Sequence, residues 1–395
     1  MNTSSPSCPV CASHDLDAVI RAAQVPTFCN KLQPTREEAM AVTRGDLDMR
    51  LCRQCAHFFN AAFDARLMNY DEGHYDNSLH GSAVFRRYAQ ELASKLVERH
   101  DLHRKQIVEI GSGRGEFLKL IADEGENSTV GFEPSPAGRE TPATNRGSVE
   151  IVPSYFGPAH KDRRADFVIC RHVLEHIEAP VEFVRMASAL LAEKSRCGFY
   201  FEVPNALYTL RDLGIWDLIY EHISYFSPVS AKQTFQSAGL QDTTLTEQFG
   251  GQYLGIEGTT RRIAANAAAC DADEIADIRI LANGFSGRFE AKKQFWQSRL
   301  GTAAERDQTV VLWGAGSKGV TFLNFLELDR EVAFIVDLNP AKHGHFVPGT
   351  AQQIVPPQAL QDGQPDLVII MNPNYAAEIQ TLLGKLGVQA ETAVA

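Results

Sequence analysis

Three glycines and two acids in one short stretch have the types and spacing of a nucleotide-binding loop. They are Glu109, Gly111, Gly113, Gly115 and Glu133. Glycines let the backbone approach a ligand closely, and an acid after the second strand of such a unit accepts hydrogen bonds from ribose hydroxyls. Glu109 lies two residues before the first glycine, where a carboxylate repels phosphate and attracts a cationic group. The pattern therefore indicates a pocket for a ligand that carries both a ribose and a cationic amino group.

The hydrophobic pattern around these residues predicts the elements that hold them. Short apolar runs at residues 107–110 and 128–132 predict two strands. Between them, apolar residues recur at helical spacing from Phe117 to Ile121, and Gly125 is the expected helix C-cap. A strand, a glycine loop, a helix and a second strand form the usual ligand-binding edge of an open α/β sheet.

The spacing of the glycines separates two kinds of ligand. Dinucleotide-binding loops carry G-x-G-x-x-G with a helix N-terminus facing the pyrophosphate, whereas the spacing here is G-x-G-x-G. Residues 109–115, Glu-Ile-Gly-Ser-Gly-Arg-Gly, resemble motif I of the class I S-adenosylmethionine (SAM) methyltransferases. The resemblance implies SAM as cofactor and a class I Rossmann-like α/β domain. The cofactor-binding residues that we expect are Glu109, Gly111, Ser112, Gly113, Gly115, Glu133, Pro134 and His172. The alternative is a tight βα turn with incidental glycines.

Four of the eight cysteines form two CxxC pairs, Cys8 with Cys11 and Cys52 with Cys55. Each pair presents two thiolates from one turn, and two pairs complete a tetrahedral S₄ site suited to structural zinc. The 40 residues between Cys11 and Cys52 exceed the usual spacing, so we expect an insertion that loops out between the pairs. A redox-active CxxC, the rival interpretation, needs only one pair.

Two histidines follow a buried strand predicted at residues 165–170. His172 and His176 are four residues apart and share a face if this stretch is helical. A metal-binding pair is disfavoured because no further carboxylate completes a recognisable pattern, so we expect a position near cofactor and substrate. Ligands of open sheets bind outside the carboxyl ends of the strands, which places Gly111, Glu133, His172 and Asn205 near one crevice.

Tyr220, Glu221 and His222 stand just before a helix start at Ser227-Pro228. A histidine beside a carboxylate can be oriented and made more basic, as a general base requires. Taken alone, these residues are better explained by a packed tyrosine and a surface Glu-His pair. Upstream, the polar-aromatic segment 70–80, which contains Tyr75, is either a lid over the glycine pocket or a solvated connector.

Composition limits the class of protein. The 395 residues suffice for two or three domains, and 44% apolar with 22% charged residues is a globular composition. A net charge of −11 without a dense basic stripe argues against nucleic acid as partner. Neither a signal peptide nor an apolar run of membrane-spanning length is present, so we expect no membrane partner and a cytoplasmic location.

The C-terminal third carries a second glycine motif. Residues 264–304 predict a polar helical connector, and Gly314, Gly316 and Gly319 then follow a strand-like run with true G-x-G-x-x-G spacing. Asp337 follows Gly316 by 21 residues, which, read alone, is a dinucleotide-binding signature and leaves an NAD(P)-dependent reductase open.

The order of the motifs resembles the sugar C-methyltransferases of deoxysugar biosynthesis, a branch of natural-product metabolism, over nearly the whole chain. The motifs are the two CxxC pairs, EIGSGRG, VLEHI, YEHISYFSP, GAGSKG and VDLNPAKHGHFVPGT. The resemblance implies a zinc module at 1–62, a SAM domain with a lid segment at 63–263 and a Rossmann-like domain at 264–395 that helps to enclose the substrate. It implies SAM-dependent methylation at C-3 of a nucleotide-linked 4-keto sugar, and makes the second glycine motif inherited scaffold rather than an NAD site.

By the same resemblance, the catalytic residues are His222, Glu221, Tyr220, His176 and Tyr75. We hypothesise that His222 removes the proton alpha to a ketone while Glu221 and Tyr220 fix its position, and that His176 and Tyr75 donate to the enolate oxygen. One departure is the sequence Gly250-Gly251-Gln252-Tyr253-Leu254, where relatives often have Gly-Gly-Ser-Leu-Arg. The missing arginine leaves the acceptor open, and the alternative is C-, O- or N-methylation of a non-sugar natural-product scaffold.

Overall fold

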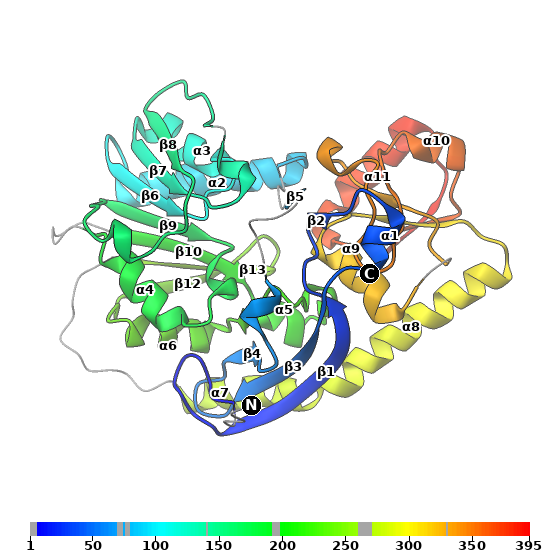
Figure 1. The fold of residues 1–395 in the computed structure, drawn as a ribbon, viewed down its shortest axis with the longest axis horizontal. Helices are drawn as coiled ribbons and strands as arrows, with labels where there is room; N and C mark the ends of the chain where they lie inside the picture. Colours follow the sequence, from blue (N-terminus) through cyan, green and yellow to red (C-terminus); the bar gives the residue numbers. More distant parts are fainter. Residues whose placement is uncertain are drawn as a thin grey trace.

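In the part of the chain that the structure describes, the fold is built around three β-sheets and a small two-stranded one (Figure 1). The structure, a computed structural model, describes residues 6–68, 74–75, 80–139, 141–191, 198–259, 271–328 and 331–395. No helix within these ranges is both long and apolar enough to cross a membrane.

A seven-stranded sheet forms the centre of the chain, with the order β12-β13-β10-β9-β6-β7-β8. Its strands are β6 (Gln106–Ile110), β7 (Ser128–Phe132), β8 (Ser148–Val152), β9 (Phe167–Arg171), β10 (Gly198–Pro204), β12 (Thr243–Gln248) and β13 (Tyr253–Thr259). The five strands from β10 to β8 in this order pair in parallel, whereas β13 pairs antiparallel with both β10 and β12. The predicted parallel core is therefore confirmed, with an antiparallel edge.

Helices cover both faces of this sheet, which explains why its strands are apolar on both sides. One face packs against α2 (Ala83–His100) and α3 (Glu116–Gly125), and the other against α4 (Pro180–Ser188) and α6 (Pro228–Ser237). The short helix α5 (Ala206–Leu210) follows β10. Helix α6 begins at Pro228 with Ser227 as its cap, as predicted. Helix α3 ends one residue later than predicted, because Glu126 and not Gly125 is its left-handed cap.

The N-terminal sheet includes a strand from the centre of the chain. Strands β1 (Leu16–Pro26), β3 (Arg44–Cys52) and β4 (Phe58–Asn60) pair antiparallel, and β11 (Ser224–Tyr225) pairs with β4 as the fourth strand. The residues between the cysteine pairs form β1 and β3, so the expected insertion is an ordered part of the N-terminal sheet. Helix α1 (Arg36–Met40) lies between them, and β2 (Lys31–Leu32) pairs with β5 (His74–Tyr75).

The C-terminal part is a five-stranded parallel sheet with the order β16-β15-β14-β17-β18. Its strands are β14 (Val310–Trp313), β15 (Ile335–Val336), β16 (Ile354–Val355), β17 (Leu367–Ile370) and β18 (Glu391–Val394), and its helices are α9 (Ser317–Leu326), α10 (Ala359–Gly363) and α11 (Ala376–Leu386). The predicted connector forms two helices, α7 (Ala272–Asn283) and α8 (Phe285–Glu305). It is more than a polar spacer, since Phe289 and Trp296 of α8 are buried.

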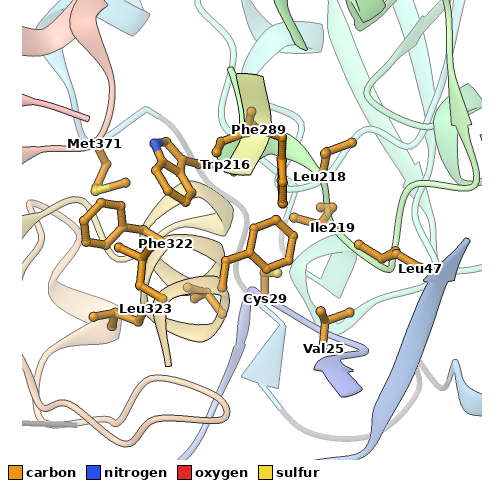
Figure 2. Close-up of a cluster of buried hydrophobic side chains, with 14 of the residues drawn as sticks. Val25, Cys29, Leu47, Trp216, Leu218, Ile219, Phe289, Phe322, Leu323 and Met371 are labelled. Carbon is orange, nitrogen blue, oxygen red and sulfur yellow. The ribbon is translucent and has the colours of Figure 1, made fainter. Parts of the chain in front are cut away.

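One buried apolar cluster joins all three parts of the chain (Figure 2). It contains Val25, Cys29 and Leu47 from the N-terminal part, Trp216, Leu218 and Ile219 from the centre, and Phe289, Phe322, Leu323 and Met371 from the C-terminal part. The indole of Trp216 meets the ring of Phe322 edge-on at a centroid distance of 4.8 Å. A shared core of this kind holds the segment before Tyr220 against the two flanking parts.

Candidate active site

A cavity of about 390 Å³ opens at the carboxyl edge of the central sheet. Its wall includes Glu109, Gly111, Ser112, Gly113, Glu133, Pro134 and His172, so seven of the eight predicted cofactor-binding residues line one space. Gly115, the eighth, is not part of the wall and instead takes a left-handed backbone (φ 72°) directly before α3. We call this space the cofactor cavity.

Glu109 is a buried acid in the wall of the cofactor cavity. Its Oε2 has no hydrogen-bond partner among the residues that the structure describes, and its exposed fraction is 2%. Burial raises the pKa of Glu109 to about 8, against the opposing positive charge of Arg171. A buried oxygen without a donor favours a ligand that brings one. The amino group of SAM fits this requirement.

The glycine loop and Glu133 hold each other in place. The carboxylate of Glu133 accepts hydrogen bonds from the backbone N–H groups of Gly113 (2.8 Å) and Ser135 (2.9 Å). Gly111 has φ 75°, and a Cβ there would lie 2.2 Å from Cγ2 of Val173. Only glycine therefore fits at this position, and the loop passes close beneath the cavity.

A second cavity, of about 200 Å³, adjoins the first and draws its wall from all three parts of the chain. The N-terminal part contributes Asn30, the centre contributes Glu175, Ile219, Glu221, His222, Gln252 and Tyr253, and the C-terminal part contributes Gly314, Gly316, Lys318, Asp337, Asn372 and Glu378, among others. Tyr75, His172 and His176 line both cavities, and we call these three the junction residues. A group transferred from one cavity to the other must pass them.

The two predicted histidines reach the junction without sharing a helix. His172 has a left-handed backbone (φ 57°), and only Leu174–His176 forms a 3₁₀ turn. The conditional helical pairing of His172 and His176 is therefore wrong. Both side chains still line the two cavities, because the chain turns back sharply after β9.

His176 and His222 form the polar centre of the second cavity. Their ring centroids are 5.0 Å apart, and Nδ1 of His176 lies 2.8 Å from the carbonyl oxygen of Glu221. Because a carbonyl only accepts, Nδ1 of His176 carries the hydrogen. Burial lowers the pKa of His176 to about 4 and that of His222 well below its usual range, so both rings are neutral near neutral pH. Glu175 adds a carboxylate within 4.8 Å of both rings, which the spacing did not predict.

Glu221 does not orient His222 through its carboxylate. Its Oε2 accepts a hydrogen bond from the backbone N–H of Cys29 (2.8 Å), and its carboxylate also accepts from the side chain of Tyr75. Burial raises the pKa of Glu221 to about 7. Glu221 therefore holds Tyr75 with its carboxylate and His176 with its carbonyl.

Tyr220 lies outside both cavities, in contrast to the predicted catalytic role. Its hydroxyl accepts from the backbone N–H of Asp64 (2.8 Å), its ring stacks on Phe63, and it fills the space beside Gly45. The neighbouring side chain of Glu221 points into the cavity, and that of Tyr220 is buried on the other side. Asn205 is also outside the walls, because it caps α5 and donates to the carbonyl of Gly251.

Two family models match consecutive parts of the chain. One, described as a methyltransferase domain, matches residues 82–245, and one, described as the C-methyltransferase C-terminal domain, matches residues 254–389. The C-methyltransferase NovU of Streptomyces niveus is 27% identical over 390 residues, which cover 94% of this chain and 90% of NovU. The protein is a SAM-dependent methyltransferase. The second model and the match to NovU along nearly the whole chain support the narrower class of C-methyltransferases.

The methyltransferase also resembles solved structures, though only weakly. Magnesium protoporphyrin IX methyltransferase (ChlM) from Synechocystis PCC 6803, solved with bound SAH, is 16% identical with a TM-score of 0.35, covering 48% of this chain and 89% of its own. Mitomycin 7-O-methyltransferase MmcR is 18% identical with a TM-score of 0.36, covering 44% of this chain and 53% of its own. At these scores neither structure bears on the site or the acceptor. The class I α/β fold of the methyltransferase, with its mixed central sheet, agrees with the first family model.

The four paired cysteines of the methyltransferase come together at one end of the N-terminal sheet. All four Sγ atoms lie within 4.8 Å of one another, with Cys8 to Cys55 at 3.6 Å and Cys11 to Cys52 at 3.5 Å. A tetrahedral site with Zn–S bonds of about 2.3 Å needs S···S separations of about 3.8 Å. The four thiols therefore fit a zinc ion.

Besides Glu175, sequence reasoning missed other residues of the methyltransferase site. Cys29 and Asn30 reach it from the N-terminal part, and no local pattern marks them, since Cys29 lies 192 positions before Glu221. Arg171 lines the cofactor cavity, and its guanidinium lies over the ring of Phe117. Its position as a charged residue at the end of a buried strand was the signal that could have found it.

Proposed function

We propose that this methyltransferase methylates a carbon alpha to a ketone, with C-3 of a nucleotide-linked 4-keto sugar as the acceptor. The observation that carries the proposal is that the two cavities meet at Tyr75, His172 and His176, with His222 on the acceptor side. SAM supplies an electrophilic methyl group in the cofactor cavity. The protein must then supply a base and a donor for the enolate oxygen in the second cavity.

His222 is the proposed base. Burial is the main cause of its low pKa and the ammonium group of Lys318 adds to it, so the neutral ring has a lone pair ready at neutral pH. After it takes the alpha proton, the imidazolium lies beside the enolate and stabilises its charge.

Tyr75 is the proposed donor to the enolate oxygen. Its hydroxyl has one hydrogen, which ionised Glu221 accepts. Because burial raises the pKa of Glu221 to about 7, protonated Glu221 can donate to the phenol oxygen instead, and the phenol hydrogen is then directed to the enolate. His176 suits the donor role less well than its sequence position suggested. Its hydrogen is engaged by the carbonyl of Glu221, so the remaining ring nitrogen is an acceptor when the ring is neutral. We therefore propose that His176 accepts a hydrogen bond from the substrate that receives the methyl group. Tyr220 is assigned a packing role.

The flanking parts support a nucleotide-linked acceptor held by three domains with the boundaries expected from the sequence. Helix α9 begins at Ser317 in the wall of the second cavity, directly after Gly314 and Gly316, and a helix N-terminus binds phosphate. Zinc at Cys8, Cys11, Cys52 and Cys55 is the proposed structural metal, because the sulfur spacing suits it.

A non-sugar ketone is the second candidate acceptor, and the charges of the second cavity favour it. Among the described residues of its wall, Glu175, Asp217, Glu221, Asp337 and Glu378 are acids, whereas only two are lysines and none is an arginine. An acidic wall suits a neutral or cationic acceptor better than a diphosphate.

The test is a panel of nucleotide-linked 4-keto sugars and nucleotide-free ketones, incubated with the enzyme and SAM. Mass spectrometry detects methyl transfer, and NMR of the product locates the new methyl group. The proposal expects a new C–C bond alpha to the ketone of a nucleotide-linked sugar. Methyl groups found only on oxygen or nitrogen, or only on nucleotide-free acceptors, would contradict it.

A further inference from the structure

Glu202 is a fully buried carboxylate that gathers donors from three elements. It lies in β10 opposite Arg171 of β9, and its Oε1 accepts from Nε (3.1 Å) and Nη2 (2.8 Å) of Arg171. Its Oε2 accepts from the hydroxyl of Tyr200 (2.8 Å) and from that of Tyr88 on α2. Strand pairing alone does not need such a cluster, and replacing it with apolar residues costs a fold little.

His172 is tied to this cluster twice. Its Nε2 lies 3.1 Å from Oε1 of Glu202, and its backbone N–H donates to the carbonyl oxygen of Glu202 at 2.8 Å. Burial opposes ionisation of Glu202, but the charge of Arg171 and the adjacent ring of His172 outweigh it and hold its pKa below the usual range. The N–H of His172 is not aligned for a hydrogen bond, but a bare ring lone pair would repel an ionised carboxylate oxygen 3.1 Å away, so the contact favours the tautomer with the hydrogen on Nε2.

His172 is also strained and centrally placed. A non-glycine residue at φ 57° is strained and persists only where its surroundings hold it. Its ring meets that of Tyr253 edge-on at a centroid distance of 4.6 Å and forms part of both cavity walls. A small rotation of this ring changes the passage between the cavities.

We propose that Glu202 is a positioning residue for methyl transfer, which fixes the ring and the tautomer of His172 at the junction of the two cavities. With Nε2–H turned to Glu202, Nδ1 is the acceptor nitrogen. Nδ1 of His172 lies 4.0 Å from Oε1 of Glu175, which is a residue of the second cavity. Nδ1 therefore accepts a hydrogen bond from the acceptor or from a water beside it, and the ring aligns the acceptor with the transferred methyl group. The proposal depends on the protein being a methyltransferase, and it holds whichever substrate receives the methyl group.

The test compares Glu202→Gln with Tyr200→Phe, which removes a donor from the other carboxylate oxygen and leaves Oε1 facing His172. We expect Glu202→Gln to lower kcat by about 10–100-fold, while the dissociation constant of SAM changes less than about threefold. Tyr200→Phe keeps kcat within about threefold of the wild type. Equal kcat values for the two variants would overturn the proposal.

A spectroscopic readout separates positioning from a purely structural role. In protein labelled with ¹⁵N-histidine, with His172→Asn used to assign the signal, the ring nitrogens of His172 in the wild type report the Nε2–H tautomer. Glu202→Asp keeps the negative charge, but its shorter side chain moves the carboxylate away from His172. We expect this variant to retain the Nε2–H tautomer and to lower kcat. An Nδ1–H tautomer in the wild type contradicts the proposal even if Glu202→Gln does not fold.

Discussion

The two cavities of this methyltransferase are built in opposite ways. The principal polar groups of the cofactor cavity come from consecutive elements of one sheet, β6, the glycine loop and β7, within residues 109–134. The second cavity takes residues from positions as distant as Asn30 and Glu378. The first depends on a local turn that glycines dictate, and the second depends on how three parts of the chain pack. Changes to the first should therefore alter cofactor affinity, and changes to the second should alter turnover or acceptor binding.

His222→Asn is expected to show the largest difference between an effect on turnover and an effect on cofactor affinity. Loss of a general base lowers kcat by about 10²–10⁴-fold, while the dissociation constant of SAM stays within about threefold. Steady-state kinetics and calorimetry measure the two quantities. His103→Asn, at an exposed position away from both cavities, is the control and keeps full activity. A comparable loss of SAM affinity in His222→Asn would break the comparison.

Glu109→Gln is expected to have the opposite effect, with a loss of SAM affinity and little change in kcat at saturating SAM. The amide cannot pair with the cationic amino group of SAM, and a charge-assisted hydrogen bond contributes about 1.5–3 kcal/mol, or about 10–100-fold in affinity. Calorimetry gives the affinity, and saturating SAM restores kcat to near the wild-type value. If kcat stayed low at saturation, Glu109 would act on turnover and the division between the cavities would fail.

The same variant changes the pH dependence of stability. The pKa of Glu109 rises from its ordinary 4.5 to about 8 on folding, so the folded state binds more protons between these values. Stability therefore falls as the pH rises from 4.5 to 8. Without ligand, the stability of Glu109→Gln relative to the wild type should be higher at pH 8 than at pH 5 by roughly 3–4 kcal/mol. Thermal unfolding at both pH values measures this, and a gain of equal size at both would contradict the shift.

Metal removal should affect the second cavity first. The knuckle of Cys52 and Cys55 leads into β4, which pairs with β11 two residues after His222, and His57 Nε2 lies 3.1 Å from Oγ of Ser224. Chelation of the proposed zinc should lower kcat by about tenfold or more and spare SAM affinity. Metal analysis and calorimetry on the same sample check this. A parallel loss of SAM binding would show that the metal supports the whole fold.

The smallest effect is expected at Gln252. Its side-chain amide exchanges two hydrogen bonds with Asn372, at 2.6 and 3.1 Å, and so joins the central and C-terminal parts at the wall of the second cavity. Gln252→Ala should raise the KM for the acceptor by about 3–10-fold, because each such bond contributes about 1 kcal/mol. Gln248→Ala, outside the cavity wall, is the matched control. An unchanged KM for Gln252→Ala would exclude a role in acceptor binding.

The two constructions explain what the sequence could predict. Gly111, Gly113 and Glu133 act through neighbours in the chain, so their spacing was enough to predict both the strands and the cofactor cavity. Tyr220 and Glu221 are adjacent and go to opposite sides, which depends on the packing against Phe63 and Cys29 and on no local pattern. The cysteine spacing predicted the cluster, but the sheet that closes it needs β11 from far along the chain. Glu202 was hidden because a single acid in an apolar strand has no spacing to interpret.

The most direct test of the account is solvent exchange at the acceptor in the presence of S-adenosylhomocysteine, which occupies the cofactor cavity and cannot donate a methyl group. In deuterated water, the wild type should wash deuterium into the alpha carbon of the best acceptor from the panel. His222→Asn should bind S-adenosylhomocysteine equally well and lose this exchange. Exchange that persists in His222→Asn, or that is absent from a wild type able to methylate the same carbon, would contradict an enolate formed by His222 in the second cavity.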